Sequence, residues 1–356
     1  MSTSQSELFG NKLWKWKETK KTSYNYKGER NSKHYKMFKK ICRLTQSKLK
    51  TYLEMRLDAY YDTVYTGDGY IYAKGTNSNV VLTAHMDTVN EPQGRICTDI
   101  YEYYDKKNKR HILSSPQGIG GDDRCGIYAI LDVLAMTDIR PTIIFCEDEE
   151  SGGVGSDKFC RTKFIKEVTD NASFMIEIDR ANANDAVFYE EDNAEFQKYV
   201  MDITGNKEAY GSFSDICNLS EESGVSSFNI SCGYYNAHTT DEYVVMEELE
   251  ACIQKVIKLL KANQEDGKKF KYEPYVYYKN SYGYDYGFGY SYNYGKRYGV
   301  SSAYGTNEVA VEFIFYRSDK QESAVVYGDT FEECVGTFLM DNPDLCWGNV
   351  YDYHEF

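Results

Sequence analysis

The sequence predicts an α/β protein of three layers, a mainly parallel sheet with helices on both faces. Short apolar runs rich in β-branched residues alternate with segments of helical periodicity along most of the chain, which is typical of parallel sheets. Acidic residues and histidines come directly after several of these runs. In open α/β sheets the ligand binds beyond the carboxyl ends of the strands, so we expect a functional site there.

Composition indicates a globular chain without a membrane span. The 356 residues suggest about two domains, and the hydrophobic content of 42% is enough for a sizeable core. No apolar run approaches the roughly 18 residues of a membrane helix, and the first residues lack the apolar stretch of a signal peptide. The ten cysteines are scattered without a C-x-x-C pair, which argues against a disulfide framework and a thiolate zinc site. We therefore expect a cytoplasmic protein with no membrane partner.

The charge is unevenly distributed along the chain. The net formal charge is −14, yet residues 1–50 hold 14 Lys and Arg against three Glu, which is +11 and leaves −25 for the remainder. A basic arm could contact nucleic acid or an acidic partner. Such runs are more often solvated tails, so nucleic acid is not expected as a partner.

Composition divides the chain into four parts. They are a basic arm (1–33), an α/β domain (34–264), a Tyr/Gly-rich segment (265–305) and a small ββα module (306–356). Between Tyr272 and Tyr304, 12 of 33 residues are tyrosine, and their alternation with glycine and asparagine favours an extended β ribbon over a flexible linker. A partner protein could bind through this segment.

Periodicity places the elements in order. Apolar residues at helical spacing predict one amphipathic helix over 35–55, and two alternating runs around a Gly-Asp-Gly turn predict a hairpin. The elements after this helix are the hairpin 59–65 with 70–74, a strand 80–83, a second hairpin about the charged turn 106–109, a helix 127–134, a strand 142–146, a helix 156–168, a strand 173–179, a helix beginning near 214, a strand 226–232 and a helix 244–260. In the last part, strands 309–316 and 323–328 precede a helix 330–340.

The run NVVLTAHMDTV, residues 79–89, carries the first two candidate site residues. Side chains of a strand alternate, so His85 and Asp87 point to the same side, and the carboxylate can accept a hydrogen bond from the imidazole. That bond fixes the tautomer and leaves the other ring nitrogen free for a metal. The pattern is common by chance, so it gains weight only from further candidate ligands downstream in the chain.

Further acids and a histidine stand beyond the later strands. They are Asp122 with Asp123, Glu149 with Glu150, Asp179 and His238. Singly, each has an ordinary explanation as an acidic turn, a helix cap or a loop histidine. Those explanations do not account for their joint position at the strand ends of one α/β unit. The set is what a two-zinc hydrolase needs, because zinc takes imidazole and carboxylate ligands and two close ions need a shared carboxylate.

One assignment of ligands balances the charge of such a site. The first ion would take His85 and Asp179, the second Glu150 and His238, and Asp122 would bridge them. Three carboxylates and one hydroxide cancel the +4 of two Zn²⁺, and Co²⁺ or Mn²⁺ could replace zinc. Glu149 is left beside a ligand and is the natural general base. It would take a proton as the metal-bound hydroxide attacks the carbonyl and then pass it to the leaving amine.

The chain resembles the zinc-dependent exopeptidase superfamily of co-catalytic aminopeptidases, carboxypeptidases and tripeptidases. The resemblance covers about residues 35–262 and lies in five ordered motifs, AHMDTV, GGDDRCG, EDEESGGVG, EIDR and YNAHTTDE. It implies the same metal ligands, which are His85, Asp122, Glu150, Asp179 and His238, with Glu149 as base and Asp87 as the partner of His85. It also implies a cis peptide between Asp122 and Asp123.

The sequence departs from parts of this family in one respect. Subfamilies with a lid or dimerisation domain insert it between the fourth and fifth ligand segments, and here that interval, 179 to 238, is only 59 residues. We therefore expect no lid.

In the aminopeptidase branch a tyrosine donates to the oxyanion, for which Tyr210 is a candidate. Arg124 and Arg180 could brace carboxylates by bidentate pairing.

These observations favour a two-zinc hydrolase that releases N-terminal residues from short peptides. An N-acyl amino acid deacylase or a carboxypeptidase would use the same site on another amide, so an acylated amino acid is an alternative substrate. A non-catalytic binding protein on the same fold, working through the Tyr/Gly-rich segment, is a third possibility.

Overall fold

The computed structural model consists of two compact units, Met1–Phe288 and Gly289–Phe356. It describes residues 29–30, 32–189 and 191–274 of the first unit, and the strands 309–317, 320–328 and 350–355 of the second. Most of the predicted basic arm and of the Tyr/Gly-rich segment lies outside the described residues. Among the described residues, no helix combines the length and the apolar character needed to cross a bilayer.

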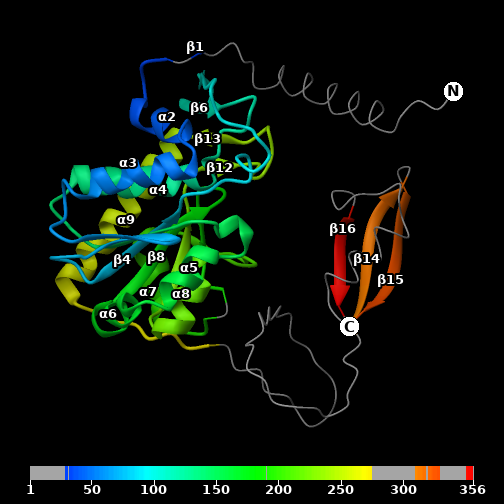
Figure 1. Cartoon of the computed structure of the whole chain (residues 1–356). Coiled ribbons are helices and arrows are strands. Elements are labelled where there is room, and N and C mark those ends of the chain that lie inside the picture. Colours follow the sequence, from blue (N-terminus) through cyan, green and yellow to red (C-terminus); the bar gives the residue numbers. More distant parts are fainter. Residues whose placement is uncertain are drawn as a thin grey trace, which may run out of the picture. The chain divides into compact units, whose positions relative to one another are not determined.

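The first unit is built on an eight-stranded sheet (Figure 1). In spatial order its strands are β10 (Lys207–Glu208), β9 (Asp185–Val187), β11 (Ser227–Ser231), β8 (Phe174–Arg180), β4 (Val80–His85), β7 (Thr142–Cys146), β3 (Tyr70–Ala73) and β2 (Val64–Gly67). The four central strands β11, β8, β4 and β7 run parallel to their neighbours in this group. The prediction of a mainly parallel sheet is confirmed, and β2 and β3 form the predicted antiparallel hairpin at one edge.

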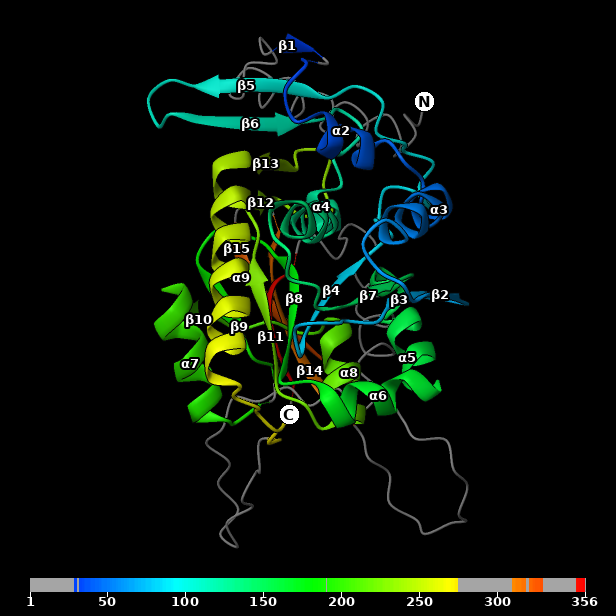
Figure 2. The ribbon, with the colours of Figure 1, turned by 90° about the vertical axis from the view of Figure 1, so that its left-hand side faces the viewer.

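Helices cover both faces of this sheet, as predicted. One face packs against α2 (Lys36–Cys42), α3 (Gln46–Leu57), α4 (Gly121–Met136), α7 (Ala194–Thr204) and α9 (Met246–Asp266). The other packs against α5 (Val154–Cys160), α6 (Lys163–Asn171) and α8 (Asp215–Ser223). Figure 2 shows α9 and α7 on one side of β8 and β11, and α5, α6 and α8 on the other. Alternation divides the strands between two cores, since Leu82 belongs to the first core and Val81 to the second.

A smaller sheet lies beyond the first of these helical layers. Its order is β1 (Glu29–Arg30), β5 (Tyr101–Asp105), β6 (Arg110–Ser114), β13 (Tyr243–Val245) and β12 (Tyr234–Tyr235), and every neighbouring pair is antiparallel. Strands β5 and β6 are the second predicted hairpin. Strand β13 corrects the predicted start of the last helix, because Val244 and Val245 pair with β6 before α9 begins at Met246.

Two predicted helices are each divided in the structure. The helix predicted over 35–55 is two helices, α2 and α3, which Thr45 separates with an extended backbone. The helix predicted over 156–168 is likewise α5 and α6. Thr162 begins the second of these, accepting a hydrogen bond from the backbone N–H of Phe164. A threonine precedes the second helix in both places, but only Thr162 makes a side-chain cap hydrogen bond.

The second unit contains a three-stranded antiparallel sheet. Strands β14 (Val309–Arg317) and β15 (Lys320–Gly328) are the two predicted strands. A third strand, β16 (Val350–Glu355), pairs with the other edge of β14 and was not predicted. The helix predicted over 330–340 lies outside the described residues.

The two sides of α3 allow a test of the layered packing. Leu53 is fully buried in the first core, whereas Met55 on the same helix is 70% exposed. We expect Leu53→Ala to lower the free energy of unfolding by about 2–5 kcal/mol, because it leaves a cavity. Met55→Ala should change it by less than about 0.5 kcal/mol. Chemical denaturation followed by circular dichroism measures both, and equal effects would contradict the packing of α3.

Candidate metal centre

The connections of the sheet create a topological switch point at β4. From β4 the chain crosses through α4 to β7 on one side, and then through α5 and α6 to β8 on the opposite side of β4. These crossovers use opposite faces of the sheet. Strand order therefore reverses at β4, and ligands of open α/β sheets bind at such a switch point. His85 is the last residue of β4.

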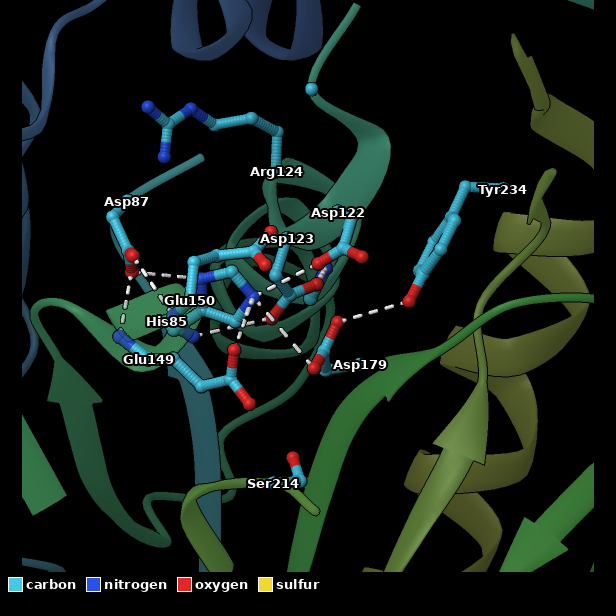
Figure 3. A network of polar contacts seen from close by, with 12 residues as sticks. His85, Asp87, Asp122, Asp123, Arg124, Glu149, Glu150, Asp179, Ser214 and Tyr234 are labelled. Carbon is cyan, nitrogen blue, oxygen red and sulfur yellow. Dashed lines mark hydrogen bonds and ion pairs between the residues drawn. The ribbon is translucent and has the colours of Figure 1, made fainter. Parts of the chain in front are cut away.

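Predicted residues from four separate segments meet at this point (Figure 3), and a fifth segment adds His238. Nε2 of His85 lies 2.9 Å from Oδ1 of Asp122, and Nε2 of His238 lies 3.2 Å from Oδ2 of the same carboxylate. Glu150 adds an oxygen 3.0 Å from Nε2 of His238, and Asp179 adds one 3.7 Å from Nε2 of His85. The carboxylate of Asp122 thus stands between the two histidines, with one further acid at each.

Asp87 orients both the first histidine and the acidic turn after β7. Its Oδ1 lies 3.0 Å from Nδ1 of His85. The same oxygen accepts a hydrogen bond from the backbone N–H of Glu149, and Oδ2 accepts one from that of Glu150, each at 3.1 Å. The predicted contact between Asp87 and His85 is therefore present, and it leaves Nε2 of His85 directed at the acids.

Negative charge is concentrated at the centre. Burial and the nearby charge of Asp122 raise the pKa of Asp179 to about 7. Burial, reinforced by the charge of Asp179, raises the pKa of Glu149 to about 10. Hydrogen bonds to Asp122 and Glu150 raise the pKa of His238 to about 11. The centre by itself therefore favours extra protons, because it gathers more carboxylates than its two histidines can balance.

The donor atoms fit a metal ion. His85, Asp122 and Glu150 bring three possible ligand atoms within 4.8 Å of one another. In addition, Oε1 of Glu150 is buried and has no hydrogen-bond partner among the described residues. A buried carboxylate oxygen without a partner is costly, and a cation at this place would satisfy it. Imidazole and carboxylate donors are also the usual ligands of zinc.

Asp123 is a geometric alternative as a ligand, but its oxygens are already engaged. His85, Asp123 and Asp179 also bring three donor atoms within 4.8 Å. Oδ2 of Asp123, however, accepts from the backbone N–H of His85 at 3.3 Å, and Oδ1 accepts from that of Gly126 at 2.8 Å. Asp123 therefore supports the start of α4, while Asp122 faces the histidines. The peptide bond between the two aspartates is cis, as the resemblance implies.

A glycine and an arginine of the motif GGDDRCG have structural roles. A Cβ at Gly126 would lie 2.2 Å from the carbonyl oxygen of Ile178, so only glycine lets α4 approach β8 this closely. Arg124 donates to the carbonyl oxygens of Met86 and Leu44, and Figure 3 shows its guanidinium directed away from the acids. The predicted pairing of Arg124 with a carboxylate is therefore wrong, since it braces the backbone instead.

Roles were also predicted for Arg180 and Tyr210. Nε of Arg180 lies 3.9 Å from one oxygen of Asp185, which is not the bidentate pair that was predicted. Tyr210 is 89% exposed, and its role as an oxyanion donor stays a prediction.

Sequence reasoning missed two supports of the centre. The fully buried side chain of Glu242 accepts from the backbone N–H groups of Gly120, at 2.8 Å, and Asp122, at 3.0 Å. Burial and the charge of Asp122 raise the pKa of Glu242 to about 8. The hydroxyl of Tyr234 donates to Oδ1 of Asp179 at 3.1 Å. Glu242 ends the motif YNAHTTDE and could have been singled out there, whereas nothing in the sequence distinguishes Tyr234 from its neighbours.

A second acidic layer lies beneath the centre and was also missed. Glu177 precedes Asp179 by two residues in β8 and is fully buried. It accepts hydrogen bonds from the hydroxyl of Ser214 and, at 3.2 Å, from the backbone N–H of Ile216. Asp215 is also fully buried, which raises its pKa to about 6. The signal in the sequence was Glu177, an acid inside the otherwise apolar strand β8.

Comparison with solved structures identifies the fold. A tripeptidase from Staphylococcus aureus is similar with a TM-score of 0.51 and 14% identity, over 64% of this chain and 97% of the other. The aminopeptidase PepT from Bacillus cereus is similar with a TM-score of 0.51 and 13% identity, over 65% of this chain and 98% of the other. A TET aminopeptidase from a marine-sediment Thaumarchaeota archaeon is similar with a TM-score of 0.50 and 12% identity, over 65% of this chain and 98% of the other.

These likenesses are structural, because no model of a protein family and no curated protein matches the sequence. At such low identity the comparisons establish the architecture that holds the candidate centre. This chain therefore has the fold of these tripeptidase and aminopeptidase structures, which agrees with the fold that the resemblance of its five motifs implies.

Proposed function

We propose that this chain is a zinc-dependent exopeptidase that cleaves the peptide bond after the N-terminal residue of short peptides. The observation that carries the proposal is the position of Asp122, whose two oxygens each face a different histidine. A single carboxylate placed in this way can bridge two ions, which is the arrangement that two-metal hydrolases need. We assign the catalytic domain to residues 34–264 and expect no lid within it.

The ligands divide into two sets around Asp122. His85 and Asp179 would hold one zinc ion, and Glu150 and His238 the other. The three carboxylates offset most of the charge of two zinc ions, and the ions in turn remove the repulsion among the acids. Two zinc ions bound there would polarise the scissile carbonyl and lower the pKa of a water molecule.

Glu149 is placed to move the proton that the reaction requires. Its Oε2 lies 4.0 Å from Nε2 of His85, and its side chain is only 12% exposed. Asp87 fixes its backbone N–H, so the carboxylate is held at the edge of the centre. Glu149 accepts the proton of the attacking water at a carboxylate oxygen and delivers it to the nitrogen of the leaving amine.

The choice of a free N-terminus rests first on the similar solved structures, which are named as a tripeptidase and aminopeptidases. Glu149, the one acid of this group that is not a proposed ligand, would also attract an α-amino group. A deacylase or a carboxypeptidase would instead have to accommodate a neutral acyl group or a free carboxylate there.

Removing the proposed base separates catalysis from metal binding. We expect Glu149→Gln to lower kcat by about 10²- to 10⁴-fold, since the amide cannot accept the proton. The zinc content, measured by elemental analysis, should stay at the wild-type value because Glu149 is not a proposed ligand. Glu195→Gln, in an exposed position on α7, is the matched control and should leave kcat unchanged. Wild-type turnover by Glu149→Gln would refute the assignment of the base.

A panel of blocked and unblocked dipeptides tests the substrate class. We expect dipeptides with a free amino group to be hydrolysed and their N-acetyl forms to be resistant, because acetylation removes the amino group that Glu149 would attract. Product release followed by chromatography measures both. Hydrolysis of the N-acetyl forms alone would favour the deacylase or carboxypeptidase alternative. A chain that binds no zinc and cleaves neither set would favour the binding protein.

A further inference from the structure

A second group of histidines and carboxylates lies on the small sheet and shares no residue with the centre. His34 comes from the segment before α2, Glu102 from β5 and His111 from β6, and their donor atoms lie within 4.8 Å of one another. The chain has five histidines, so this group and the centre use two each. Figure 2 shows the hairpin β5–β6 and the strand β4 on opposite sides of α4.

The distances within the group suit a metal ion. Nδ1 of His34 lies 2.8 Å from Oε1 of Glu102, and Nε2 of His111 lies 4.0 Å from the same oxygen. In a tetrahedral zinc site with bonds of about 2.1 Å, neighbouring ligand atoms are about 3.4 Å apart. The two observed separations lie on either side of this value. Small side-chain adjustments would therefore bring all three atoms onto one ion.

The ring of His111 is oriented as a metal ligand would be. Its Nδ1 lies 2.7 Å from Oε1 of Glu247 on α9, whose other oxygen accepts from the backbone N–H of His111 at 2.7 Å. With Nδ1 engaged by Glu247, Nε2 is the ring nitrogen available on the side of Glu102. Asp87 orients His85 in the same way at the centre, and such a carboxylate partner is typical of metal-bound histidine.

The second oxygen of Glu102 is already satisfied, which leaves Oε1 for the ion. Oε2 accepts from the ammonium group of Lys39, at 2.8 Å, and from the hydroxyl of Ser32. Glu102 itself is only 6% exposed, so its position is well defined. The rings of Tyr104 and Tyr35 pack against His111 with centroid distances of 4.6 and 5.7 Å and limit its rotation.

The charge around the group also favours a divalent ion. Glu102, Glu247 and Glu250 carry three negative charges, and Glu250 interacts with both His111 and Glu247. Lys39 supplies one positive charge in contact with Glu102. The carboxylates thus exceed the ammonium group by two negative charges, which one divalent cation would cancel.

We propose that His34, Glu102 and His111 form a separate zinc-type site that fastens the N-terminal segment to the small sheet. Two imidazoles and one carboxylate are ligands that zinc accepts, with a fourth position left for water. The ion joins His34 to residues that lie 68 and more positions away in the sequence, and it fixes a histidine that is otherwise 67% exposed. This inference does not depend on the proposed peptidase activity.

Counting zinc in single-site variants tests the proposal on the full chain. Each protein is saturated with zinc and desalted, and its zinc content is measured by elemental analysis. We expect His34→Ala, His111→Ala and Glu102→Gln each to hold one zinc fewer than the wild type, with turnover of the wild-type substrate unchanged. His354→Ala, on β16 of the second unit, is the matched control and should equal the wild type. Each variant is compared with the wild type, so zinc bound at the metal centre contributes equally to both and does not affect the difference.

A variant of Glu247, which orients His111 without being a ligand, provides a second test if a ligand variant fails to fold. Glu247→Gln leaves all three ligands in place but weakens the orientation of His111, so we expect the zinc affinity of this site to fall about 10- to 100-fold. Competition with a chelating dye measures that affinity, and circular dichroism checks the fold. Equal zinc content in all three ligand variants, or an affinity unchanged in Glu247→Gln, would overturn the proposal.

Discussion

The structure of the candidate centre depends on the gathering of buried carboxylates around one pair of histidines. Moving each such charge out of water costs several kcal/mol unless a partner compensates it. Here the two histidines cannot balance Asp122, Glu149, Glu150 and Asp179, and the raised pKa values of Glu149 and Asp179 express this imbalance. Two divalent cations would remove it, which is why we interpret the acids as a metal centre.

The fold brings these charges together because the sheet reverses its strand order at β4. The supports around the centre then use backbone groups to hold each acid in place. Asp87 binds the N–H groups of the turn after β7, Asp123 binds those of β4 and α4, and Glu242 binds those at the start of α4. Each of these three carboxylates therefore fixes a segment that carries a ligand, while the ligand side chains face the histidines.

Much of the fold could be predicted because its signals are local. The strand Thr142–Cys146 has the predicted bounds, and strand alternation alone placed His85 beside Asp87. The ordered motifs then predicted which acids meet. The sequence could not reveal contacts that join distant positions without a periodic pattern. Glu242 reaches a backbone group 120 positions away, and β16 pairs with β14 through residues that showed no strand pattern. The breaks between α2 and α3 and between α5 and α6 were missed because apolar spacing continues across them.

Anomalous scattering at the zinc edge, from crystals of the zinc-loaded chain, would show whether Asp122 bridges two metal ions. We expect two peaks about 3.5–4 Å apart, one on each side of the Asp122 carboxylate. A single peak, or no peak within bonding distance of Asp122, would contradict it.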